Sequence, residues 1–350
     1  MNLIGIFILT ALIFEFVLHR LSEALNLRSA SATVPDAFKD LYDSQRYARA
    51  QDYLRARTRF AWISSGVFLA ATLAFWLGGG FGLLDGAVRS LGHGPVLSGL
   101  VYVGALWIGR SILAVPFQAY SVFVIEERFG FNRTNFKTFL TDGVKALVVS
   151  VLIGAPLLAG LLSLFEHAGL RAWVYGWALA VFFMAGIQFV TPRLTLPLFN
   201  KFTPLEEGEL RSAIFNYTRS IRFPLENVFV MDGSRRSTKS NAFFTGFGKH
   251  RRIALFDTLI RAHTIPELVA ILAHETGHYR KKHVLKNLAF GVVLSGALLF
   301  AFSFALRSPI LFDAFFVEQP SVYSGLVLFS VLLRPFDLLL GLLLNIVSRS

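Results

Sequence analysis

Two histidines and a glutamate on one predicted helix are the residues whose types and spacing point most directly to chemistry. They lie in the run His274-Glu275-Thr276-Gly277-His278. Histidines four residues apart on a helix point the same way, one turn apart, so two neutral imidazoles can bind one zinc ion. Glu275 lies beside them, where a carboxylate can take a proton from a water and pass it to a leaving amine. The pattern predicts a zinc metalloprotease site.

A catalytic zinc also needs a third protein ligand and an open position for water. His283 is the nearest candidate, but on a continuous helix it would lie about 140° round from His278, on the wrong face. Three carboxylates further along have no local pattern that marks them as ligands: Asp313, Glu318 and Asp337. The residues near the motif therefore leave the third ligand unassigned.

The element that must carry the motif is a helix that begins near Thr264. The run Thr264-Ile265-Pro266-Glu267 is a capping box with proline in the first turn. This helix lies within residues 194–284. These residues are richer in charge than the rest of the chain and contain short apolar runs of period two with glycine-rich turns, which is typical of a soluble insertion. We expect a helix at 205–220 and strands at 227–231, 241–244 and 252–256.

The remainder of the chain has the composition of a membrane protein. Apolar types make up 54% of the 350 residues and charged types 16%, against about 25% charged residues in soluble proteins. A spanning helix needs about 20 mostly apolar residues. Seven runs qualify: 2–25, 60–84, 96–120, 144–165, 171–193, 285–306 and 321–347. We expect the first run to be a retained span rather than a cleaved signal peptide, because it is long and lacks a basic start.

The basic residues indicate the orientation. The net charge is +12, but Lys and Arg gather in alternate loops and no nucleic-acid motif is present, so we expect no nucleic-acid partner. Segments 20–59, 121–145 and 194–284 are basic, whereas the loops between them contain few cations. The positive-inside rule therefore places the N-terminus outside and the metal motif in the cytoplasm. The lack of cysteine excludes disulfides and cysteine-based metal sites.

Beyond the motif, the sequence resembles the Ste24-like CAAX prenyl proteases, a group within the M48 family of zinc metallopeptidases. The resemblance implies a mainly α, multi-spanning membrane protein with about seven transmembrane helices around a chamber, and a small cytoplasmic α+β zincin-like domain. It implies one Zn²⁺ per chain, with His274 and His278 as ligands and Glu275 as general base. The stretches that carry it are 126–132, 197–202, 232–237, 240–248 and 253–259.

The resemblance also implies a substrate and a way of binding it. Family members are endopeptidases that remove the last three residues of prenylated proteins. The stretch Asn241-Ala242-Phe243 matches the strand edge on which the substrate peptide lies as an added strand. The expected partners are thus a peptide or prenylated protein and the lipid membrane. An Arg-rich composition favours a bacterial inner membrane over the endoplasmic reticulum, and the oligomeric state is not predicted.

The apolar runs and the soluble insertion divide the chain into three parts: 1–195 with five transmembrane helices, 196–284 as the metalloprotease core, and 285–350 with two more transmembrane helices. In the family a Ser-Arg pair near the end of span seven precedes the glutamate that completes the zinc site. Here the chain stops at Ser348-Arg349-Ser350. We therefore expect the third ligand beyond Ser350, and a truncated chain that binds zinc weakly and cleaves little. Two alternatives stay open: a membrane quality-control protease, and an inactive scaffold.

Overall fold

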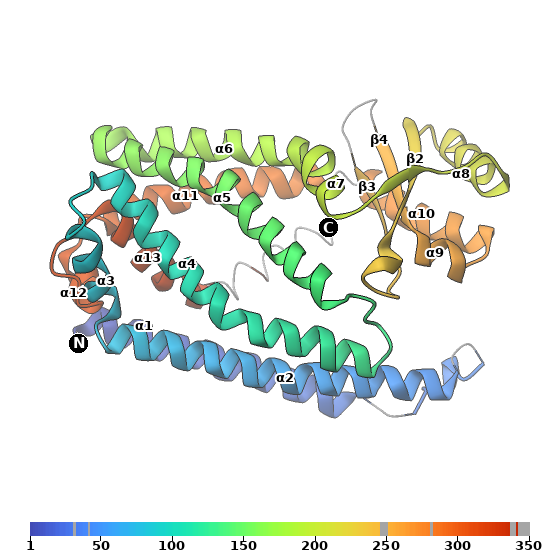
Figure 1. The fold of residues 1–350 in the computed structure, drawn as a ribbon, viewed down its shortest axis with the longest axis horizontal. Coiled ribbons are helices and arrows are strands. Elements are labelled where there is room, and N and C mark those ends of the chain that lie inside the picture. Colours follow the sequence, from blue (N-terminus) through green and yellow to red (C-terminus); the bar gives the residue numbers. More distant parts are fainter. Residues whose placement is uncertain (31–32, 41–42, 246–250, 281–282, 337–340, 342–350) are drawn as a thin grey trace. The chain divides into compact units, whose positions relative to one another are not determined.

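Helices dominate the computed structural model, which describes residues 1–350 apart from 31–32, 41–42, 246–250, 281–282, 337–340 and 342–350. The one sheet of this description lies between residues 202 and 256 (Figure 1). Two compact units can be separated. The described chain passes between them at Phe129–Gly130 and inside three long helices. Unit 1 comprises Met1–Phe129, Leu157–Ala178 and Ser295–Arg349, and unit 2 comprises Gly130–Pro156, Leu179–Leu294 and Ser350.

Six helices of the described part are long and apolar enough to span a membrane, so the chain is an integral membrane protein. They correspond to the first six predicted runs. A further apolar helix, α13 (Val322–Leu333), is shorter and falls in the seventh run, most of whose later residues lie outside the described residues. The six contain α1 (Leu3–Ser29), α2 (Ser44–Leu77), α4 (Pro95–Tyr120), α5 (Phe136–His167), α6 (Ala172–Val190) and α11 (His283–Ala305).

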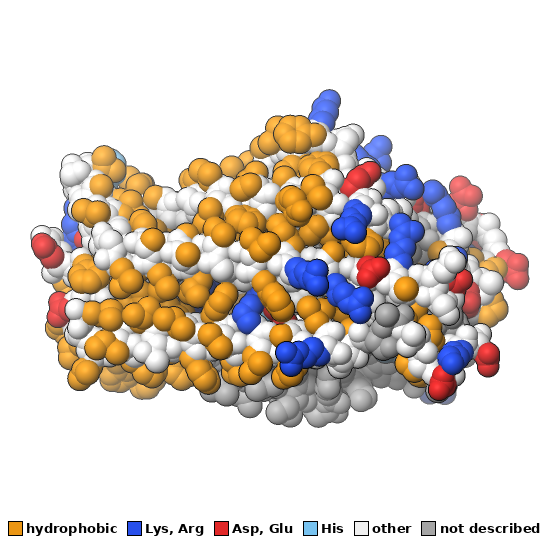
Figure 2. Space-filling view, turned by 90° about the horizontal axis from the view of Figure 1, so that it is seen from below, with side chains coloured by type: hydrophobic (Ala, Val, Ile, Leu, Met, Phe, Trp, Pro, Cys, Tyr) orange, Lys and Arg blue, Asp and Glu red, His pale blue; other side chains and the backbone are white. Residues whose placement is uncertain are grey.

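The predicted second span is wrong at its end. The apolar pattern predicted that this span ends at residue 84. In the structure α2 ends at Leu77, and a separate helix, α3 (Gly80–Arg89), follows. Gly79 between them has a φ of 73°, a conformation that side chains disfavour and glycine accepts. The apolar run therefore continues through a turn. Hydrophobic side chains are spread along the visible surface of the long helices (Figure 2), as lipid contact requires.

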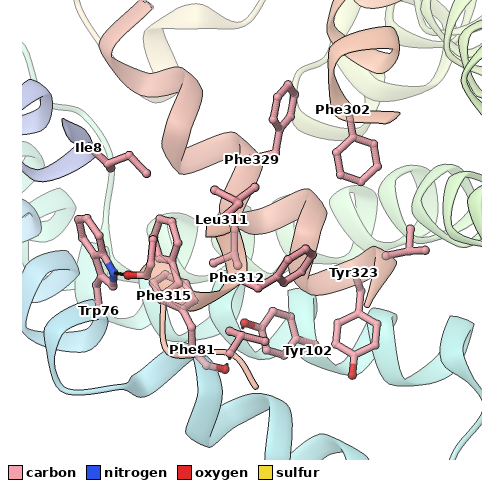
Figure 3. Packing of buried hydrophobic residues seen from close by; sticks show 14 of the residues in the cluster. Ile8, Trp76, Phe81, Tyr102, Phe302, Leu311, Phe312, Phe315, Tyr323 and Phe329 are labelled. Carbon is pink, nitrogen blue, oxygen red and sulfur yellow. Dashed lines mark hydrogen bonds between the residues drawn. The ribbon is translucent and has the colours of Figure 1, made fainter. Parts of the chain in front are cut away.

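Aromatic side chains form the core of unit 1. Trp76 stacks on Phe315 with ring centroids 4.6 Å apart, and Phe81 meets the same ring edge-on at 5.5 Å. The Trp76 Nε1–H donates to the carbonyl oxygen of Ala314 at 2.8 Å, the dashed line in Figure 3. Ala314 is the last residue of α12 (Pro309–Ala314), and Phe315 follows it directly. This core therefore joins α2 and α3 to a segment more than two hundred residues later.

Unit 2 contains a four-stranded sheet with the strand order β1-β2-β4-β3. β2 and β4 are parallel at its centre, whereas β1 and β3 run antiparallel at its two ends. The three predicted strands are confirmed as β2, β3 and β4, while β1 was not predicted. The strands are β1 (Phe202–Pro204), β2 (Leu225–Met231), β3 (Ala242–Thr245) and β4 (Arg251–Phe256).

Three helices cover this sheet through one buried apolar cluster. The predicted helix at 205–220 is present as the shorter α8, and α10 starts where the capping box predicted. The cluster contains Ile214 from α8, Leu259 from α9, and Leu268 and Leu272 from α10, packed on strand residues such as Ile253. The helices are α8 (Glu209–Ser220), α9 (Asp257–Ala262) and α10 (Ile265–Arg280), and a fourth, α7 (Leu196–Phe199), precedes β1.

The carboxylate of Asp257 fixes the turn between β2 and β3 to the start of α9. It accepts hydrogen bonds from the backbone N–H of Ser234 at 2.8 Å, from the Ser234 hydroxyl, and from the Thr258 N–H at 2.9 Å. Burial opposes the charge, but these hydrogen bonds and the nearby Arg261 outweigh it, so the pKa of Asp257 lies below its usual range. The turn also requires Gly233, because a Cβ there would collide with the Phe256 ring.

The lowered pKa of Asp257 predicts a dependence of stability on pH. The ionised form stabilises the fold, so the stabilisation is complete above the pKa of the unfolded chain, about 4, and is lost as pH falls through the lower folded pKa. Asp257→Asn should lower the thermal midpoint at pH 7, and the gap to the wild type should narrow below about pH 4. Thermal unfolding of the purified chain across this range measures both. Glu206→Gln, an exposed carboxylate of the same unit, is the matched control. A gap independent of pH would contradict the prediction.

Candidate active site

The helix α10 has one face in the core of unit 2 and another face away from it. Leu268 and Leu272 are each about 1% exposed, and Thr276 is about 2% exposed, so residues four apart define the buried face. Successive residues on a helix are about 100° apart. Positions 274 and 278 therefore lie about 140° away from the buried face. His274 is exposed, as this placement requires, and Glu275 is half-buried between the two faces.

The start of α10 is held by the predicted capping box. The Glu267 carboxylate accepts hydrogen bonds from the backbone N–H of Thr264 at 2.8 Å and from its hydroxyl at 3.0 Å. These bonds hold the pKa of Glu267 below its usual range. The cap leaves fewer backbone donors of the first helical turn unsatisfied, which fixes where the helix begins and so the direction of every later side chain.

Thr276, inside the motif, fixes the middle of the helix to its neighbour. Its hydroxyl shares a hydrogen bond of 2.9 Å with the Tyr217 hydroxyl on α8 and also donates to the Ala273 carbonyl at 2.9 Å. No role for Thr276 was predicted from the sequence. Thr276 lies eight residues after Leu268 on the same helical face, and this spacing was the signal that could have predicted its burial in the core.

The open side of the motif helix lies at Gly277. A Cβ built on this glycine meets no atom within 4 Å in the described structure, so the residue does not serve close packing within the fold. It leaves space beside His274. Position 278 belongs to α10 one turn further on, but the side chain of His278 lies outside the described residues, as does that of His283 at the start of α11.

The stretch predicted to bind substrate lies at the edge of the sheet. β3 is the last strand in the order, paired with β4 on one side, and Ala242 is opposite Leu255. The N–H of Phe256 donates to the carbonyl of Asn241 at 3.0 Å. Because alternate residues of an antiparallel pair exchange hydrogen bonds, Ala242 and Phe244 direct their backbone groups away from β4. The Ala242 N–H donates to the side-chain oxygen of its neighbour Asn241 at 2.9 Å.

Arg236 joins two of the stretches on which the family resemblance depends, 232–237 and 197–202, and also bonds to residues outside them. Its guanidinium donates two hydrogen bonds to the Asp142 carboxylate, at 2.7 and 3.1 Å, and others to the Asn200 side chain at 3.0 Å and the Phe199 carbonyl. Its own carbonyl accepts from the Arg133 N–H at 3.0 Å. The bidentate geometry is specific to arginine. The segment leading into β3 is thus anchored to α5 and α7 at once.

Anchoring continues one step further toward β3. The Thr238 N–H donates to the Phe131 carbonyl at 3.0 Å, and its hydroxyl donates to the Gly130 carbonyl at 3.1 Å. Asn132 and Ser237 form an isolated antiparallel bridge. The segments 130–134 and 236–239 therefore run side by side as a short ribbon. Parts of both segments belong to the stretches 126–132 and 232–237 that carry the family resemblance, but nothing in the sequence predicted that they would meet.

The described donors are compatible with a metal site but do not complete one. An exposed imidazole at His274, a second histidine one helical turn on and a carboxylate at Glu275 make up a donor set suited to zinc. Within the described residues, no group of three or more metal-ligating side chains is assembled. Asp313 and Glu318 are exposed residues of unit 1, and Asp337 lies outside the described residues, as does the Ser348-Arg349-Ser350 end.

Comparison with known proteins accounts for nearly all of the sequence. A family model described as CAAX prenyl protease N-terminal, five membrane helices, matches residues 23–201, and the model for peptidase family M48 matches residues 204–350. The chain is 32% identical to the CAAX prenyl protease 1 homolog of Arabidopsis thaliana over 98% of this chain and 84% of the relative. It is 31% identical to CAAX prenyl protease 1 of Saccharomyces cerevisiae over 91% of this chain and 76% of the relative.

The fold agrees with a solved relative. The crystal structure of S. mikatae Ste24p superposes with a TM-score of 0.93 at 28% identity, covering 99% of this chain and 86% of that chain. The predicted fold class, a helical membrane protein with a small α+β metalloprotease domain, is thereby confirmed, and the M48 family implies zinc. The sequence match, the membrane helices and the fold agree, and the chain therefore belongs to peptidase family M48 as a membrane metalloprotease of the Ste24 type.

Proposed function

We propose that this chain hydrolyses peptide bonds next to the membrane with one zinc ion per chain, held by His274 and His278, and with Glu275 as general base. The observation that carries the proposal is the division of α10 into two faces. Leu268 and Leu272 are buried, while His274 is exposed on the other side with Glu275 beside it. A helix that merely packed in a core would have no use for an exposed histidine with a second histidine one turn further along its sequence.

The chain's own residues have distinct tasks in this mechanism. Zinc, when bound, makes a water more acidic and polarises the peptide carbonyl. Glu275, half-buried and next to His274, takes the proton of the attacking water and returns it to the nitrogen of the leaving amine. Thr276, buried and bonded to Tyr217 of α8, fixes the rotation of α10 relative to the rest of unit 2, and so the direction in which Glu275 and His274 project. The remaining ligand is not assigned to a described residue.

We propose further that the substrate adds to the sheet as a strand beside β3. Ala242 and Phe244 direct backbone groups to the open edge, which suits pairing with an extended peptide. In the absence of substrate, the Asn241 side-chain oxygen accepts the hydrogen bond from the Ala242 N–H. A carbonyl of the bound peptide replaces that oxygen as the acceptor. Phe243 faces away from the core cluster, which includes Ala242 and Phe244, and is placed to contact substrate side chains.

The location and division of the chain follow the same proposal. Lys and Arg concentrate in segments 20–59, 121–145 and 194–284, which supports a cytoplasmic motif under the positive-inside rule. The functional parts we propose are 1–195 for the membrane domain, 196–284 for the protease core and 285–350 for the last membrane helices. The bacterial inner membrane rather than the endoplasmic reticulum, and the chamber among the helices, stay predictions.

Glu275→Gln should abolish hydrolysis while leaving zinc bound. The amide keeps the shape of the side chain but cannot accept the proton, and loss of a general base costs about 10²–10⁴-fold in rate. Turnover of a fluorogenic peptide and the zinc content of the purified chain are measured together, with Glu206→Gln as a matched surface control. His274→Ala should lose both zinc and turnover. Wild-type turnover in Glu275→Gln would contradict the assignment of the base.

Strand addition at β3 predicts an alternating pattern in modified substrates. A series of peptides, each with one N-methylated backbone amide, removes one possible hydrogen bond at a time. Amides that pair with β3 should raise KM about fivefold when methylated, because a typical hydrogen bond contributes about 1 kcal/mol, and the amides between them should have little effect. The alternate positions are the internal control. Equal effects at consecutive amides would show that the peptide does not bind as a paired strand.

The substrate class is taken from the names of the relatives, which are CAAX prenyl proteases. We expect a farnesylated peptide with a CAAX-type C-terminus to be cleaved more efficiently than the same peptide without the lipid, three residues from its end. Mass spectrometry of the products, with the chain reconstituted in lipid vesicles, identifies the bond. Equal cleavage of both peptides, or preferential cleavage of an unfolded membrane protein, would instead support the quality-control alternative.

A further inference from the structure

Unit 1 contains a cavity of about 600 Å³, whereas the candidate catalytic residues all belong to unit 2. Four of its lining residues mark the ends of apolar helices. Pro95 begins α4, Glu166 is next to the end of α5, Leu306 follows the end of α11, and Val322 begins α13. Since spanning helices end where hydrocarbon gives way to headgroups, these helix ends are expected to put the cavity at the headgroup level of a membrane.

A buried carboxylate fixes a cation in this cavity. Asp85 is 4% exposed, and its two oxygens accept from Arg89 Nε at 2.7 Å and from the Tyr323 hydroxyl at 2.6 Å. Arg89 Nη2 donates to the carbonyl of Gln319 at 2.8 Å. A guanidinium has five N–H donors, and the bonds to described residues use two of them. The remaining three are held in a fixed position on a wall of the cavity, which suits a phosphate group.

A carboxylate lines the same cavity without a direct partner. Glu166 is exposed, and among the described residues it makes no hydrogen bond or ion pair. It is nevertheless near Arg89: burial lowers the pKa of Arg89, but the hydrogen bond and charge of Asp85, with smaller contributions from Tyr323 and Glu166, raise it overall. The cavity thus presents a preorganised cation and an unpaired anion, which together match a ligand that carries both charges.

We propose that this cavity binds the headgroup of a zwitterionic phospholipid with a primary amine, of the phosphatidylethanolamine type. Arg89, with His93 beside it on the lining, receives the phosphate, and Glu166 accepts hydrogen bonds from the ammonium group. The lining also includes the apolar side chains of Leu306 and Val322, which provide a surface for the start of the acyl chains. The proposal depends on unit 1 alone and does not require the proposed peptidase activity.

The choice of a lipid over a soluble zwitterion follows from where the cavity lies. Its lining comes from the ends of membrane helices, where a headgroup is already present at high local concentration. A primary amine is favoured over choline because Glu166 accepts hydrogen bonds and a quaternary ammonium has none to donate. An anionic lipid without an amine would engage Arg89 but leave Glu166 unpaired, and would also be repelled by its charge.

Native mass spectrometry of the delipidated full chain tests this proposal through titration with phosphatidylethanolamine and phosphatidylglycerol of equal chain length. The wild type should retain one phosphatidylethanolamine with about threefold to fivefold preference, the size expected for a partly exposed charge pair. Glu166→Gln should abolish the preference, because an amide cannot pair with the ammonium charge. Asp313→Asn, an exposed carboxylate of unit 1 away from the cavity, should behave as the wild type.

Three outcomes would overturn the proposal: equal retention of the two lipids by the wild type, an unchanged preference in Glu166→Gln, or the same loss in Asp313→Asn. Soluble phosphoethanolamine separates the two sources of the headgroup. If it binds as tightly as the lipid, the lipid assignment is wrong. Arg89→Lys should weaken both lipids by removing the fork of donors. If that variant does not fold, the comparison of Glu166→Gln with Asp313→Asn decides alone, since Glu166 has no bond within the described fold.

Discussion

The burial of Leu268 and Leu272 against the sheet is the interaction on which the candidate site depends. Each is about 1% exposed, and burial of a leucine side chain contributes roughly 1.5–3 kcal/mol. Because a helix is rigid, fixing this face also fixes the opposite one, where His274 and position 278 lie. A zinc site needs its ligands held in place before the metal arrives. The precision of the motif thus comes from leucines that take no part in the chemistry.

The edge strand β3 depends in the same way on contacts outside the protease motif. Arg236 binds Asp142 and Asn200 with its side chain and Arg133 with its carbonyl, only a few residues before β3 begins. Asp142 belongs to a helix long and apolar enough to span a membrane, so the edge strand proposed to bind substrate is attached to the membrane part of unit 2 rather than to the sheet alone. A soluble protease domain would need no such attachment. The arrangement suits an enzyme whose peptide substrates reach it from the lipid surface.

Local patterns in the sequence predicted local structure well. The capping box at Thr264 located the start of α10, and the period-two runs located β2, β3 and β4, because these signals arise from neighbouring residues. These local signals failed where a turn or the pairing with a distant segment determines the structure. The glycines after Leu77 end α2 although the apolar run continues. β1 has three residues, and only its pairing with β2 makes it a strand. The meeting of 130–134 with 236–239 joins segments about a hundred residues apart, which periodicity does not reveal.

Stability alone gives a poor account of the pairing of Asp85 with Arg89. The side chain of Asp85 is 6% exposed, whereas that of Arg89 is 34% exposed, so the cost of desolvation falls mainly on the carboxylate. Burying a carboxylate is unfavourable, and apolar replacements of buried charged groups are often as stable. The surroundings of Asp85 are aromatic, including Tyr323 and Tyr102, so an apolar core was available here. What the pair provides that an apolar core does not is a guanidinium with a fixed direction at a helix end. Asp85 therefore serves to orient Arg89. A bound group on the Arg89 guanidinium would account for a buried carboxylate at this position.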